Sequence, residues 1–243
     1  MATHWNLSGD YYVDAINGDD SNAGTTTAPF KTIPAAVSAA EAAGSGHVDI
    51  IVGPGTYTDR IVGSSTSDYI HLKADGEVIF DASTTGTISA FYQCFNWSVT
   101  GFIIRDTQTA LFGGTGTYIP KIFNCYIKNA EWYSSGFSLI AAGNYSNFRN
   151  TIFDNVVSTY ATTGTSYSRH WTFNNCIFFN CTLPGFTSTG GYVSSNNYNH
   201  YLTNCLFDSD IPSFVSFYRY QGGLLTNVIF TPRTKCRDQT LGY

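Results

Sequence analysis

Four charged residues follow short apolar triplets at regular intervals along the middle of the chain: Asp81, Arg105, Lys128 and Asp154. Neighbouring members are 23 to 26 residues apart. A carboxylate can hold a cation and a basic side chain can remove a proton next to a uronate carboxylate, so these residue types suit a polysaccharide lyase. The alternative is a ladder of exposed charges, in which each opposite pair stabilises the fold by about 0–1 kcal/mol.

A pair of carboxylates would instead suit a glycoside hydrolase. The carboxylates in the same part of the chain are Asp81, Asp106, Glu131, Asp154, Asp208 and Asp210. Their spacing singles out no pair, and solvated turn residues are the alternative for each.

Aromatic residues in the loops form a third candidate set, because aromatic rings stack on sugars and also anchor protein interfaces. Its members are Trp132, Tyr133, Trp171, Tyr192 and Tyr218. Protein contacts and glycan contacts both remain open for these residues.

The elements that position these side chains are predicted from eight apolar triplets spaced 23 to 29 residues apart. They begin at Ile50, Val78, Phe102, Cys125, Thr151, Cys176, Cys205 and Val228. The residue before each triplet is Asp49, Glu77, Gly101, Asn124, Asn150, Asn175, Asn204 or Asn227. Gly and Asn enter the left-handed region most easily, so we expect a one-residue bend between two strands. A repeat of about 25 residues without a helix predicts a coil of a parallel β-helix. We expect the asparagines to form a hydrogen-bonded ladder inside it.

The middle residues of the triplets form an apolar stripe on the opposite face of their strands from the two flanking residues. The stripe comprises Ile79, Ile103, Tyr126, Ile152, Ile177, Leu206 and Ile229. An exposed stripe of this length indicates an interface, and we expect parallel rods to meet along it in a homotrimer. Coverage by the N- or C-terminal segment of the chain is the alternative.

The composition excludes several classes of protein. Charged residues make up only 12% of the 243 residues and aromatic residues 16%, which favours strands over helices. The net charge is −5 without a basic cluster, so no nucleic-acid partner is expected. No apolar run is long enough to span a bilayer, and the N-terminus lacks the apolar core of a signal peptide. The six cysteines are expected to be reduced packing residues, and no metal site or cofactor is predicted.

The region before the repeats contains signals for a short helix. Thr32, Pro34, an Ala-rich run over 35–43 and Gly44 predict a helix that covers the first coil. An Asp- and Asn-rich stretch at 14–22 precedes it, and a structural turn is favoured there over a calcium loop.

Two motifs carry a resemblance to a known family. They are the stretch from Tyr11 to Ile33, with Asn17-Gly18-Asp19-Asp20 and Ala28-Pro29-Phe30, and the segment Val52-Gly53-Pro54-Gly55-Thr56-Tyr57. Both resemble the beginning of pectin-lyase-like, right-handed parallel β-helix proteins, among them phage tailspikes and other virion appendages. The resemblance is specific for fold and not for chemistry, because this scaffold hosts lyases, hydrolases, binding proteins and inert rods.

The sequence therefore predicts an all-β protein, a right-handed parallel β-helix of about eight coils with a short N-terminal capping helix. The expected divisions are an N-terminal segment with the helix at 1–46, the β-helix at 47–231 and a C-terminal tail at 232–243. The favoured function is a trimeric structural or receptor-contacting protein on a bacteriophage virion, such as a head decoration, short tailspike or fibre. Its partners would be other virion proteins and a host surface glycan. The alternative is a polysaccharide lyase or glycoside hydrolase that acts on such a glycan.

Overall fold

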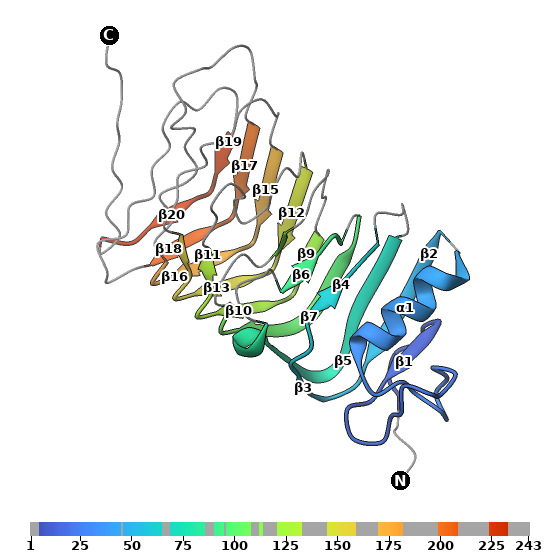
Figure 1. The fold of residues 1–243 in the computed structure, drawn as a ribbon. Coiled ribbons are helices and arrows are strands. Elements are labelled where there is room, and N and C mark those ends of the chain that lie inside the picture. Colours follow the sequence, from blue (N-terminus) through green and yellow to red (C-terminus); the bar gives the residue numbers. More distant parts are fainter. Residues whose placement is uncertain are drawn as a thin grey trace.

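Parallel strands stacked into successive rungs form most of the computed structural model (Figure 1). The structure describes residues 5–44, 46–64, 69–85, 90–94, 96–107, 112–113, 121–132, 145–158, 170–181, 199–208 and 224–232. One α-helix accompanies the strands, so the predicted all-β, right-handed parallel β-helix with a capping helix is confirmed. Within these residues no helix is long and apolar enough to cross a membrane.

The first ladder of strands runs along the whole solenoid. It contains β1 (Tyr11–Val13), β2 (His47–Val52), the first half of β5 (Tyr69–Asp81), the first half of β7 (Ser98–Arg105), β9 (Lys121–Phe123), β12 (Tyr145–Arg149), β15 (His170–Asn174), β17 (Asn199–Thr203) and β19 (Leu224–Thr226). All pairings within it are parallel, as expected for successive coils.

The second ladder carries seven of the eight predicted triplets. It contains β3 (Gly55–Tyr57), the second halves of β5 and β7, β10 (Tyr126–Lys128), β13 (Ile152–Asp154), β16 (Ile177–Phe179), β18 (Leu206–Asp208) and β20 (Ile229–Phe230). A third set is formed by β4 (Ile61–Val62), β6 (Phe91–Tyr92) and β8 (Phe112–Gly113), and by β11 (Glu131–Trp132) with β14 (Val157–Ser158). A short 3-10 helix, η1 (Ala82–Thr84), follows β5.

The prediction for the first repeat was wrong. Ile50–Val52 pairs with Leu72–Ala74 in the first ladder, and Gly55–Tyr57 pairs with Val78–Phe80 in its place. The first triplet is an apolar strand like the others, so the triplet pattern alone does not distinguish the two ladders. The expected count of eight coils is not confirmed either: a third strand is described only between residues 61 and 158, and the solenoid amounts to about four turns.

The bends between the two ladders have the predicted conformation. Gly101 and the five asparagines at 124, 150, 175, 204 and 227 have positive φ, between 51° and 81°. Each of the last four asparagines donates from Nδ2 to Oδ1 of the asparagine one coil earlier, at 3.0 to 3.2 Å. We call this the first asparagine ladder. It lies on the outer surface and not inside the coil, because the bend turns the short side chain away from the core.

A second line of left-handed residues lies at the other end of the triplet strands. Asp106, Asn129, Asn155 and Asn180 have φ between 49° and 57°. Asn129 donates to Asp106 Oδ1 at 3.1 Å, and Asn155 donates to Asn129 Oδ1 at 3.0 Å. The triplet strands of β7, β10, β13 and β16 are therefore bent at both ends by a residue in the left-handed conformation.

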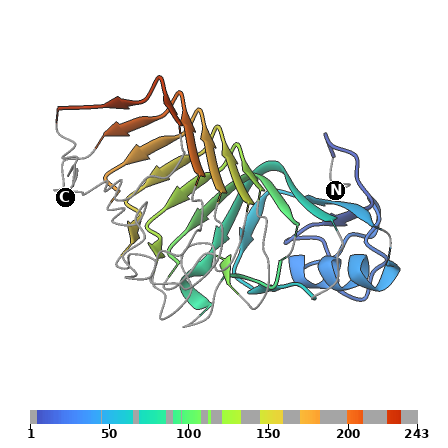
Figure 2. The ribbon, with the colours of Figure 1, turned by 90° about the horizontal axis from the view of Figure 1, so that it is seen from above.

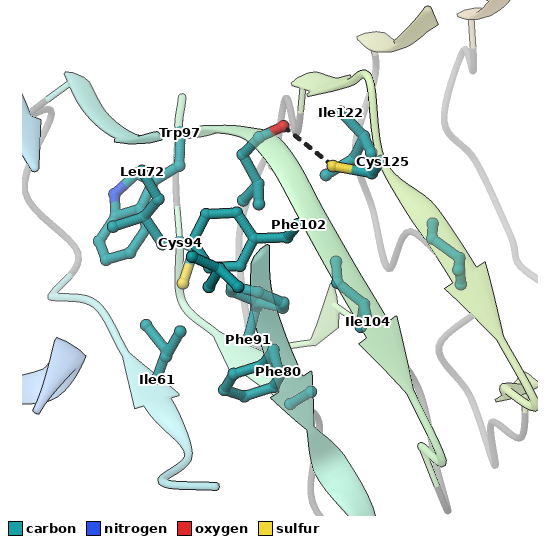
Figure 3. Close-up of a cluster of buried hydrophobic side chains, with 14 of the residues drawn as sticks. Ile61, Leu72, Phe80, Phe91, Cys94, Trp97, Phe102, Ile104, Ile122 and Cys125 are labelled. Atoms are coloured by element: carbon teal, nitrogen blue, oxygen red, sulfur yellow. Dashed lines mark hydrogen bonds between the residues drawn. The ribbon is translucent and has the colours of Figure 1, made fainter. Parts of the chain in front are cut away.

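The inward side chains fill the coil with apolar columns. In one column, Phe153, Phe178, Phe207 and Phe230 stack with ring centres 4.4 to 5.0 Å apart. Nearer the helix, Leu72, Phe80, Phe91 and Phe102 meet inside the first coils (Figure 3). Such burial stabilises the fold by about 1.5–3 kcal/mol per large side chain.

The thiols occupy this interior as packing residues. Cys94, Cys125, Cys176, Cys181 and Cys205 are buried and unpaired, and Cys236 lies outside the described residues. Cys125 and Cys176 share one column with Thr151, and each of these side chains donates to a carbonyl oxygen of the preceding coil. Burial raises the pKa of Cys125 to about 12, so this thiol keeps its proton at neutral pH.

The N-terminal end is covered by α1 (Ile33–Ala43), which lies beside the first rungs in Figures 1 and 2. Thr32 Oγ1 accepts from Ala35 N at the start of the helix, and Gly44 ends it in the left-handed conformation, as the sequence predicts. The turn before it is structural: Asp14 accepts hydrogen bonds from the backbone of Ile16 and Asn17.

Candidate functional site

Titratable side chains gather on the outer face of the first ladder, which we call the first-strand face. Strands β2 and β5 are paired so that His47 lies opposite Tyr69 and Asp49 lies opposite His71. Lys73 follows His71 by two residues on the same side of β5, since side chains alternate along a strand. The inward neighbours Ile50 and Leu72 are fully buried, which fixes this orientation.

The carboxylate of Asp49 is at the centre of this group. Asp49 Oδ2 accepts a charged hydrogen bond from Lys73 Nζ at 2.5 Å, and Asp49 Oδ1 lies 3.6 Å from His71 Nδ1. The rings of His47 and His71 meet edge-on with centres 4.6 Å apart. Lys121, from β9, places its ammonium group 5.9 Å from the ring centre of Tyr69. Two ammonium groups, two imidazoles and one carboxylate therefore lie close together.

The environment of His71 lowers the pKa of its imidazole below the ordinary 6.5. Burial is the largest cause, and the charge of His47 comes next; Lys73 and Lys121 act in the same direction, while Asp49 opposes them. The ring is therefore neutral at neutral pH and has a free lone pair. A neutral imidazole between cations is suited to accept a proton from a bound anion.

The predicted charge column lies on the outer face of the second ladder, which we call the second-strand face. The register places Asp81 beside Arg105, Arg105 beside Lys128, and Lys128 beside Asp154. Arg105 Nη2 contacts Asp81 Oδ2 at 2.9 Å, and Arg105 Nε lies 3.5 Å from Asp106 Oδ2. In the part of the chain that is described, Lys128 has no ion-pair partner.

The two carboxylates of this column are engaged in local contacts. Asp81 caps η1 and accepts from the backbone of Ser83; hydrogen bonds from Ser83 and the charge of Arg105 lower the pKa of the Asp81 carboxyl. Asp154 accepts a short hydrogen bond from the hydroxyl of Tyr126, which raises the pKa of Tyr126 to about 12. The contacts join Arg105 to Asp81 and Tyr126 to Asp154, and among the described residues none of them links the four charged residues into one group.

The apolar stripe also points outward on the second-strand face. Ile152, Ile177 and Ile229 are 39%, 36% and 61% exposed, whereas Ile79, Ile103, Tyr126 and Leu206 are half-buried by their neighbours in the stack. Phe179, next to Ile177, adds an exposed ring. Ile51 of β2 was counted with the triplets but lies on the first-strand face. Its outward side chain is fully buried, and Gly9 near the N-terminus lies against it.

Most of the predicted loop aromatics cannot be placed. Tyr133, Tyr192 and Tyr218 lie outside the described residues. The backbones of Trp132 and Trp171 belong to β11 and β15, in different sheets. Among the carboxylates considered for a glycoside hydrolase, Asp210 lies outside the described residues, and Asp208 accepts a hydrogen bond from Thr231 Oγ1 at 2.8 Å.

The sequence analysis missed the group around His71. The alternating spacings His47-x-Asp49 and Tyr69-x-His71-x-Lys73 show that these side chains share one face of two strands. The triplet pattern instead predicts a bend at Asp49, because it places the strand of Ile50 in the wrong ladder. Among the described residues no group of three or more His, Cys, Asp and Glu side chains is arranged to hold a metal ion.

Comparison with known proteins identifies a family. Residues 16–197 match the family described as "Protein of unknown function (DUF1565)", and the chain belongs to this family. No curated protein matches the chain.

Among solved structures, a rhamnogalacturonan lyase is similar over 90% of this chain and 72% of its own. The two share 17% of their residues, with a TM-score of 0.36. So distant a likeness carries no conclusion about activity. The fold itself is a parallel β-helix, and neither comparison names a virion protein.

Proposed function

We propose that this member of the DUF1565 family is a carbohydrate-active enzyme that binds an acidic polysaccharide on the first-strand face and cleaves it by β-elimination. The observation that carries the proposal is the position of His71 on an outer face, with Nδ1 3.6 Å from Asp49 Oδ1 and with Lys73 two residues along the same strand. Burial lowers the pKa of its imidazole and so favours the neutral form. The catalytic role therefore belongs to the group around Asp49 and not to the charge column of Asp81, Arg105, Lys128 and Asp154. Both carboxylates of that column are engaged in local contacts.

The reaction follows from the charges. The ammonium groups of Lys73 and Lys121 would neutralise the carboxylate of a uronate residue, which makes the proton on the adjacent carbon more acidic. His71 would take that proton. The electron pair of the broken C–H bond would then form a carbon–carbon double bond as the glycosidic C–O bond breaks. The leaving oxygen then takes a proton from water. Asp49 would stabilise the imidazolium, since its carboxylate lies 3.6 Å from Nδ1.

The test is the ultraviolet absorbance of the unsaturated sugar end produced from polygalacturonate, alginate or hyaluronate. We expect His71→Ala to lower the rate by about 100-fold or more, because general-base catalysis contributes about 10²–10⁴-fold. Asp81→Ala, on the second-strand face, is the matched control and should retain the wild-type rate. The absence of unsaturated product from every substrate, or a full rate in His71→Ala, would overturn the proposal.

A second candidate is a trimeric surface protein of a bacteriophage virion that contacts a host glycan without cleaving it. The exposure of Ile152, Ile177 and Ile229 supports self-association, because long apolar stripes mark interfaces. Light scattering should then give three times the 26.6 kDa chain mass, and the double variant Ile152→Ser, Ile177→Ser should give a monomer. A wild-type mass of 26.6 kDa would exclude the trimer.

A further inference from the structure

Four polar residues on four adjacent strands form one line across the first-strand face. Asp49 of β2 is paired with His71 of β5, His71 with Ser98 of β7, and Ser98 with Lys121 of β9. Adjacent strands are about 4.8 Å apart, so the four residues occupy neighbouring positions on the face. Their order is a carboxylate, an imidazole, a hydroxyl and an ammonium group.

All four side chains point to the same side of the sheet. The residue that follows each of them is fully or almost fully buried in the core: Ile50, Leu72, Val99 and Ile122. Because side chains alternate along a strand, their polar neighbours face outward. Ser98 is nevertheless only 4% exposed, as expected for a short side chain between the longer ones of His71 and Lys121.

The first member of the line is held firmly. Asp49 N donates to Asp10 Oδ2 at 2.8 Å, and Asp10 N donates to Asp49 O at 2.8 Å. Lys73 holds the carboxylate itself through Oδ2, which leaves Oδ1 on the side of His71 Nδ1. Nδ1 of His71 lies on the side of Asp49, so Nε2 is the ring nitrogen that would have to accept the proton of the Ser98 hydroxyl.

We propose that Asp49, His71, Ser98 and Lys121 form an acyl-transfer site in which Ser98 is the nucleophile that hydrolyses short O-acyl esters. This activity goes beyond the proposed β-elimination, which makes no use of Ser98. Because Ser98 is only 4% exposed between His71 and Lys121, the expected acyl group is short, such as an acetyl ester on a sugar hydroxyl.

The steps balance without a cofactor. Ser98 Oγ attacks the ester carbonyl carbon while its proton moves to His71 Nε2, and the negative carbonyl oxygen is stabilised by the Lys121 ammonium group. The C–O bond to the alcohol breaks, and the alcohol leaves with the proton from His71. Water then attacks the acyl-serine and gives one proton to His71; the carboxylic acid leaves, and Ser98 recovers its proton. Asp49 stabilises the imidazolium in both halves of the reaction.

The experiment uses the whole chain with para-nitrophenyl acetate and an organophosphorus probe that labels activated serines. We expect hydrolysis by the wild type and a labelled peptide that contains Ser98. Ser98→Ala should lose the label and about 100-fold or more of the rate. Thr100→Ala, an outward residue two positions further along β7, is the matched control and should keep both.

A second variant distinguishes loss of the nucleophile from loss of folding in Ser98→Ala. Ser98→Cys keeps a nucleophile of similar size, and the acetylated thiol at this position should be found by mass spectrometry after reaction with the ester. Either an unlabelled wild type, or a Ser98→Ala protein that keeps the wild-type rate, would overturn the proposal. The formation of unsaturated sugar separates the two activities. β-Elimination should persist in Ser98→Ala, and a wild type without β-elimination would leave the result of the ester assay unaffected.

Discussion

The two outer faces of the solenoid are built by successive strands of the same coils, yet they carry different side chains. On the first-strand face, Asp49, His71 and Lys73 form a compact polar group with a carboxylate at its centre. On the second-strand face, an isoleucine stripe runs beside separate surface contacts such as Arg105 with Asp81. The repeat therefore constrains the residue types at the bends and in the interior, whereas the residue types at outward positions differ between the two faces. Chemistry on this fold is therefore found where outward residues of adjacent coils complement each other.

The largest loss of stability should come from replacing an inward residue of the second ladder. Phe178 stacks between Phe153 and Phe207, so Phe178→Ala should lower the free energy of unfolding by about 3–5 kcal/mol. Phe179, the next residue, is 38% exposed, and Phe179→Ala should cost less than about 0.5 kcal/mol. Urea denaturation measures both. Equal losses would show that the second-strand face is as constrained as the core.

The bend between the two faces should be the next most sensitive position. Asn175 has a φ of 54° and makes a ladder bond to each neighbouring coil, so Asn175→Ala should cost about 2 kcal/mol. Asn174→Ala, one residue earlier in β15, should cost less than about 0.5 kcal/mol. Asn175→Gly restores the left-handed freedom without the ladder bonds, and its unfolding free energy separates the two contributions.

A smaller effect is expected for the surface contacts of Asp81. The folded state lowers the pKa of this carboxyl below 3.8, so its contribution is present above that pH and is lost as the pH falls through the folded-state value. Asp81→Asn should therefore reduce stability at neutral pH by about 1 kcal/mol or less, and the difference should vanish in strong acid. Urea denaturation at the two pH values measures it. A difference that persists in acid would show that packing, not charge, is responsible.

The smallest expected change is a shift in the pKa of a histidine on the first-strand face. The charge of His47 is the second cause, after burial, of the lowered pKa of His71. His47→Gln should raise the pKa of His71 toward 6.5 without altering the fold. A histidine NMR titration measures this change. Thr172→Gln, on the same face in β15, is the control, and an unchanged His71 titration in His47→Gln would remove His47 from the group.

Much of the fold was predictable because the bends and triplets are local signals. Asparagine before an apolar triplet predicted the left-handed bend at five coils, and Thr32 with Gly44 predicted both ends of the helix. The first coil was mistaken because its triplet resembles the others while its bend, between β2 and β3, contains Gly53 and Pro54 in place of asparagine. That single error concealed the candidate site: Asp49 meets His71 only when β2 is placed in the first ladder. The outer location of the asparagine ladder also depends on the direction of the bend, which sequence spacing does not specify.

The first asparagine ladder has a direction, and this has a consequence for how the chain is made. Each side-chain amide donates to the preceding coil, as Asn175 does to Asn150, while the backbone N–H of Asn175 donates to Thr203 O in the following one. A finished coil therefore presents an acceptor and a donor in place for a coil that has not yet been synthesised. During translation, the helix-capped N-terminal end can serve as a template on which later coils are added one at a time, so an interrupted chain would end in an unused rung.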